Sequence, residues 1–81
     1  MKATALKNKL SKLAIDFTTE SNGYNVDIKF SINGFDFIAE QKEKSEEIIS
    51  FVRIICYDNQ TQEMQIRTFD NLNQVLKYAN R

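Results

Sequence analysis

The feature that most constrains the fold of this chain is an alternation of apolar and polar residues over positions 24–32, followed at once by an Asn-Gly pair. The apolar positions are Tyr24, Val26, Ile28, Phe30 and Ile32. A repeat of two residues places them on one face of an extended strand and the polar residues on the other. The sequence therefore predicts a half-buried β-strand at these positions.

The pair Asn33-Gly34 predicts the turn that follows this strand. Both residue types tolerate the positive φ that a two-residue type I′ turn requires. The alternation then resumes over residues 35–40. Because a two-residue loop fixes the register of a hairpin, the sequence pairs Ile32 with Phe35, Phe30 with Phe37 and Ile28 with Ala39.

Two further strands and two helices complete the predicted fold. Residues 48–57 and 63–69 have strand character. Apolar residues at helical spacing predict a first helix over about Thr4 to Thr18, with the buried positions Leu6, Leu10, Leu13, Ala14 and Phe17. Asp70 is the predicted N-cap of a closing helix with the apolar face Leu72, Val75, Leu76 and Ala79. We expect an α+β fold of order α-β-β-β-β-α, a four-stranded antiparallel meander sheet with both helices packed on one face.

The strand over residues 48–57 is apolar on both faces, which is typical of a central strand or of a strand whose outer face meets something else. We assign to the helix-covered face Val52, Ile54, Cys56, Met64 and Ile66. The second face of the sheet then collects Ile38, Phe51, Ile55 and Tyr57 with the basic residues Lys29, Arg53 and Arg67.

Length and charge bound the function classes. A chain of 81 residues has room for one domain, so residues 1–81 are expected to form a single α+β unit. Eleven Lys and Arg balance eleven Asp and Glu, which excludes the overall basic field of a dedicated nucleic-acid binder. The basic residues gather at the start of the chain, where no acid interrupts Lys2, Lys7, Lys9 and Lys12.

The residue types that are missing exclude most catalytic sites. With no His and one Cys, the chain cannot build a Ser-His-Asp triad, a Cys-His dyad or the common zinc sites. We therefore expect a non-enzymatic protein with no cofactor and no metal. Cys56 alone allows no internal disulfide, and no apolar run is long enough for a membrane span or a signal peptide, so a cytoplasmic location is expected.

The leading functional hypothesis is that the second sheet face binds protein, because an exposed patch of large apolar residues is typical of a protein interface. We predict a small protein–protein interaction module that associates with itself as a homodimer or binds and inhibits a partner protein. An excess of Lys over Arg, many Asn and Ile and no Pro are typical of low-GC bacteria and their phages or mobile elements. The predicted partner-binding residues are Ile38, Phe51, Arg53, Ile55, Tyr57 and Arg67.

Two alternatives remain open for the same face. Basic and aromatic side chains that interleave on a sheet can stack bases and hold phosphates, although acids are predicted on the same polar face at Asp27, Asp36 and Glu40. Alternatively, one helix wraps around the sheet and buries this face. The candidate nucleic-acid-binding residues are Lys9, Lys12, Lys29, Arg53, Tyr57 and Arg67.

Overall fold

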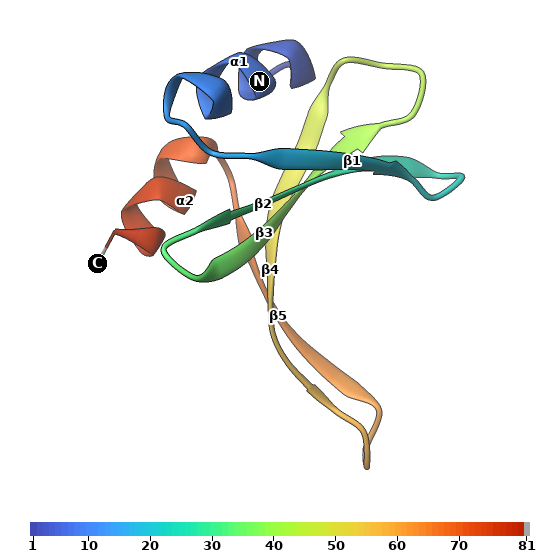
Figure 1. Ribbon diagram of the computed structural model, residues 1–81. Coiled ribbons are helices and arrows are strands. Elements are labelled where there is room, and N and C mark those ends of the chain that lie inside the picture. The colour runs from blue at the N-terminus through green and yellow to red at the C-terminus, as the bar shows by residue number, and fades with distance from the viewer. Residues whose placement is uncertain (81) are drawn as a thin grey trace.

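The computed structural model describes residues 1–80, except for the side chains of Cys56, Tyr57, Asp58, Glu63 and Met64. Two helices flank five strands, in the order α1 (Ala3–Lys12), β1 (Phe17–Ser21), β2 (Asn25–Ile32), β3 (Phe35–Lys42), β4 (Ile48–Asp58), β5 (Glu63–Phe69) and α2 (Leu72–Ala79). The strands form one antiparallel sheet in chain order, a meander (Figure 1). The α+β class and the antiparallel sheet are confirmed, but the sheet has five strands rather than the predicted four.

The additional strand, β1, lies where the sequence predicted the end of the first helix. The helix stops at Lys12 because Ala14 adopts a left-handed backbone, with φ 57°. The N–H of Ala14 donates to the carbonyl of Ser11, and that of Ile15 donates to the carbonyl of Leu10. This pair of bonds is a Schellman motif, which satisfies the last carbonyls of a helix and turns the chain away from the helix axis. Phe17 therefore pairs with Phe30 across the sheet instead of lying on a helix.

The predicted hairpin is confirmed. Asn33 and Gly34 have φ angles of 52° and 84°, as a type I′ turn requires. The register across β2 and β3 pairs Ile32 with Phe35, Phe30 with Phe37 and Ile28 with Ala39. Asn33 also ties the turn to the end of α2, because its Nδ2 donates to the carbonyl oxygen of Ala79 over 2.8 Å.

The predicted faces of β4 are wrong, because a bulge near its start shifts the alternation by one residue. Gln41 of β3 pairs with Ile48 and Glu40 pairs with Ser50, so Ile49 is an extra residue without a partner on β3. After the bulge Phe51 is 2% exposed and lies in the core. Val52, Ile54 and Ile66, which the sequence assigned to the helix-covered face, therefore lie on the other face.

Both helices pack on one face of the sheet and share a single hydrophobic core (Figure 1). The closing helix is capped by Asn71 rather than by the predicted Asp70, since the side chain of Asn71 accepts a hydrogen bond from the N–H of Gln74 over 2.9 Å. Tyr24, predicted to face inward, is 85% exposed. Neither described helix has the length and apolarity that crossing a membrane requires. The buried core residues of the sheet are Ile28, Phe30, Ile32, Phe37, Ala39, Phe51 and Phe69, and those of the helices are Ala3, Leu6, Leu10, Leu72, Val75 and Ala79.

Strands β4 and β5 extend beyond the rest of the sheet. β3 pairs with β4 only as far as Val52, whereas β4 and β5 stay paired as far as Asp58 and Glu63. Residues 54–66 therefore form a two-stranded projection, which is called the ribbon below and points away from both helices in Figure 1. A second bulge, between Ile54 and Cys56, leaves Ile55 without a partner on β5.

Candidate functional site

The predicted partner-binding residues do not lie on one surface. Ile38 is half-buried on the face of the sheet away from the helices, here called the outer face, and Ile55 is exposed on the ribbon. Phe51 is in the core, which is a correction to its predicted exposure. Arg53 and Arg67 lie on the helix side, also contrary to their predicted placement. The side chain of Tyr57 is outside the part of the chain that the structure describes.

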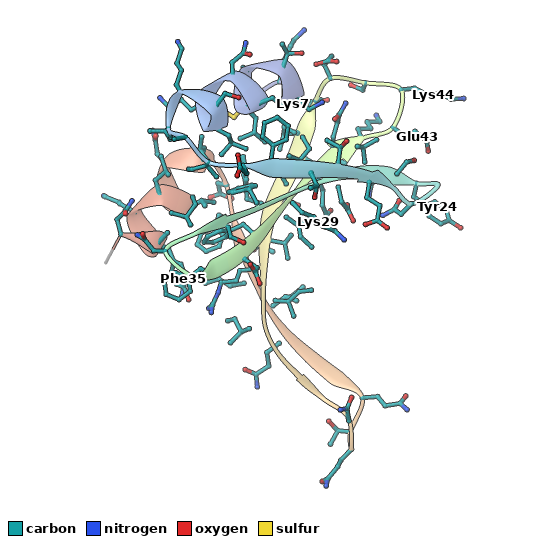
Figure 2. All side chains as sticks on the ribbon, in the orientation of Figure 1. Lys7, Tyr24, Lys29, Phe35, Glu43 and Lys44 are labelled. Atoms are coloured by element: carbon teal, nitrogen blue, oxygen red, sulfur yellow. The ribbon has the colours of Figure 1, made fainter. Side chains whose placement is uncertain are left out.

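The placement of the two arginines follows from the register. Lys29, Ile38 and Val52 lie opposite one another in a row across β2, β3 and β4. Because neighbouring residues on a strand point to opposite faces, Arg53 points away from that row and toward α2. Phe35, labelled at the β2–β3 turn in Figure 2, has its ring centre 5.5 Å from that of Tyr78 on α2, whereas Lys29 is labelled further along the sheet. The outer face therefore holds Lys29 but neither arginine.

Acidic residues dominate the charged positions of the outer face. Lys29 donates to Glu20 over 2.8 Å, and this ion pair raises the pKa of Lys29 and lowers that of Glu20. Ser50 donates to Glu40 over 3.4 Å. The register places Asp27 and Asp36 on the same face. A surface with this balance of charges repels a phosphate backbone.

An apolar stripe runs from the outer face onto the ribbon. Ile54 and Ile66 lie directly opposite each other on β4 and β5. They are 47% and 52% exposed, and the bulged Ile55 is 46% exposed. We call these three residues the isoleucine stripe. Sequence analysis missed two of them, since it placed Ile54 and Ile66 in the core; the signal available was the doublet Ile54-Ile55, which interrupts a period-two pattern as a bulge does.

On the helix side, Arg53 and Arg67 both lie close to the ring of Tyr78 from α2. The guanidinium carbon of Arg53 lies 4.7 Å from the ring centre of Phe35 and 5.4 Å from that of Tyr78. That of Arg67 lies 5.6 Å from the ring centre of Phe69 and 5.0 Å from that of Tyr78. The sequence grouped the two arginines correctly on one face, but it gave no sign of their three aromatic neighbours.

The candidate nucleic-acid-binding residues are also dispersed. Lys9 and Lys12 lie in the last turn of α1, where positive charge is favoured by the partial negative charge of a helix C-terminus. Lys29 is paired with Glu20 on the outer face, and Arg53 lies on the helix side. These residues do not form one continuous basic surface.

Comparison with known proteins adds no assignment, because no protein-family model, curated protein or solved structure matches this chain. Among the described side chains, no three potential metal ligands of the His, Cys, Asp or Glu type lie close enough together to hold an ion. The isoleucine stripe and the arginine pair are the two surfaces of this structure that suggest a function.

Proposed function

We propose that this protein is a small non-catalytic interaction module that binds protein through its ribbon, and that its partner there is a second copy of the same chain. The observation that carries the proposal is the isoleucine stripe of Ile54, Ile55 and Ile66, each about half exposed. Complete burial of an exposed isoleucine side chain contributes about 1.5–3 kcal/mol. Because each of the three is already about half buried, covering the stripe provides roughly half of that per side chain as a driving force for association.

The architecture of the ribbon supports this proposal. An isolated two-stranded hairpin is at best marginally stable in water, and residues 54–66 have no third strand or helix beside them among the described elements. β5 is also an edge strand of the sheet, and an unprotected edge invites pairing with another chain. A partner that packs on the ribbon would stabilise it and cover its apolar residues.

A second copy fits this surface for two reasons. The net charge of zero places no overall repulsion between copies. The stripe itself contains no charged side chain, so the same patch can meet itself across a twofold axis, as the symmetry of a dimer requires. A stable interface buries about 800 Å² on each partner, and the outer face next to the stripe, with the half-buried Ile38, can extend the contact.

Sedimentation velocity over a range of micromolar concentrations tests the proposal. The native chain should sediment as a dimer, and Ile66→Lys should sediment as a monomer, because a charge at the centre of the stripe would have to be buried without a partner. Ile49→Lys is the matched control, since Ile49 is equally exposed but lies at the other end of β4. Circular dichroism would check that each variant folds.

Two results would overturn the proposal. One is a native chain that remains monomeric throughout the concentration range. The other is an Ile66→Lys variant that dimerises as well as the Ile49→Lys control, which would place the interface elsewhere on the molecule.

A further inference from the structure

The second surface, on the helix side, has an unusual arrangement of charge. Arg53 and Arg67 are directly opposite each other on β4 and β5. Like charges in this position destabilise a pair of strands. Contacts of the two side chains within the protein, or an anion bound from outside it, can offset this repulsion.

No acid among the described side chains provides such a contact. The ion pair that the structure shows, between Lys29 and Glu20, is on the outer face. Asp58 and Glu63 are at the far end of the ribbon, roughly 15 Å along the strands from the two arginines. Among the described side chains, no carboxylate forms an ion pair with either arginine.

Aromatic rings hold the two guanidinium groups in place. Arg53 lies against Phe35 and Tyr78, and its Nη1 donates to the Tyr78 hydroxyl over 2.5 Å. Arg67 lies against Phe69 and Tyr78. Cation–π contacts with a ring occupy the face of a guanidinium and leave the N–H groups at its edge available. Arg53 uses one of its five side-chain N–H donors on Tyr78, and the guanidinium group of Arg67 makes no hydrogen bond to a described residue.

We propose that Arg53 and Arg67 form a binding site for a phosphate monoester, a function that is separate from association through the ribbon. A guanidinium group matches the geometry of phosphate oxygens and can donate two parallel hydrogen bonds to them. Two such groups side by side favour a dianion over a monoanion, because a dianion neutralises both. Arg67 and Tyr78 also line a shallow hollow together with Gln74 and Lys77 of α2. Lys77 is therefore a third cation next to the proposed site.

The first experiment measures binding of inorganic phosphate at constant ionic strength, followed by the side-chain Nε–H signals of Arg53 and Arg67 in NMR spectra. Phosphate should shift both signals in a saturable manner, and acetate, a monoanion, should bind more weakly. Arg67→Gln should weaken phosphate binding about ten- to hundredfold, as expected for the loss of charge-assisted hydrogen bonds. Lys9→Gln removes the same charge from α1 and should leave the affinity unchanged.

A second arm distinguishes the source of the phosphate. Phenyl phosphate, a monoester, should bind at least as tightly as inorganic phosphate. A short single-stranded oligonucleotide, which carries phosphodiesters, should bind with no dependence on Arg67. The proposal is overturned if phosphate binds no better than acetate, or if Arg67→Gln and Lys9→Gln affect it equally. It is also overturned in favour of nucleic acid if only the oligonucleotide binds, with a salt slope of about −0.7 per neutralised phosphate.

Discussion

Phe51 shows how one residue can be misplaced by a sequence pattern that is otherwise correct. Residues 48–57 were correctly predicted to be extended, and both of their faces are apolar. The sequence of this segment does not show that Ile49 is a bulge residue. An isoleucine without a partner on the neighbouring strand cannot be told from a paired isoleucine by residue type alone. The bulge depends on how β3 meets β4, which is a contact between segments and not a property of either segment. The sequence therefore predicted the strand correctly but not which of its residues face the core.

The burial of Phe51 predicts a large loss of stability on truncation. Phe51→Ala removes a side chain that is 2% exposed, and it should lower the free energy of unfolding by about 3–5 kcal/mol. Ile55→Ala, on the exposed ribbon, should cost less than about 1 kcal/mol in the monomer. Urea denaturation, on an Ile66→Lys background that removes association, would measure both. Equal midpoints for the two variants would contradict the core position of Phe51.

At the scale of elements, the hairpin and the first helix show what local sequence can determine. The β2–β3 hairpin was predicted down to its register, because the Asn33-Gly34 turn and the alternation of the strands both act locally and agree. The end of α1 was not predicted, since Ala14 occupies a position that usually requires glycine and Phe17 continues the helical spacing. Thr18 and Thr19 favour a strand, and they were the signal that could have corrected the boundary.

The left-handed backbone at Ala14 predicts a stabilising substitution. A residue with a Cβ in this conformation costs about 1–2 kcal/mol, and glycine avoids this cost but loses more chain entropy on folding. Ala14→Gly should therefore raise the free energy of unfolding by about 0.5–1 kcal/mol. Ala5→Gly, at an exposed position within α1, should lower it by about 0.5–1 kcal/mol. Thermal melts that gave both variants the same sign would show that α1 does not end in this motif.

At the scale of the whole molecule, the residues of the predicted site lie on two separate surfaces, although the sequence predicted them on one. Arg53, Arg67 and Ile55 were predicted to share one surface, but the arginines face α2 and Ile55 lies on the ribbon. Local alternation identifies which residues share a face within one strand. It does not identify which face a helix covers, because that depends on where the chain goes after Phe69 and before Phe17.

The attachment of α1 to the body of the molecule is a second whole-molecule property, and it depends on a carboxylate far away in the sequence. Glu46, in the loop between β3 and β4, accepts hydrogen bonds through Oε2 from the backbone N–H and the hydroxyl of Thr4, over 3.2 and 2.7 Å. Its carbonyl oxygen accepts from the N–H of Ala3. Glu46 thus caps the first turn of a helix that has no side-chain cap of its own.

This attachment predicts a loss of stability in acid. The bonds from Thr4 are the main cause that lowers the pKa of Glu46 below its ordinary value of 4.5, and the positive charges of Lys7 and Lys2 add to the effect. A carboxyl whose pKa is lower in the folded state stabilises the fold above its unfolded pKa, and this contribution is lost as the pH falls through the folded pKa. Glu46→Gln should therefore melt at a lower temperature than the native chain at pH 7, and the difference should shrink as the pH falls below 4.5. Glu43→Gln, in the same loop and without a hydrogen bond from a described side chain, should follow the native profile. If Glu46→Gln and Glu43→Gln gave the same profile from pH 7 to pH 3, the carboxylate of Glu46 would not contribute to the attachment of α1.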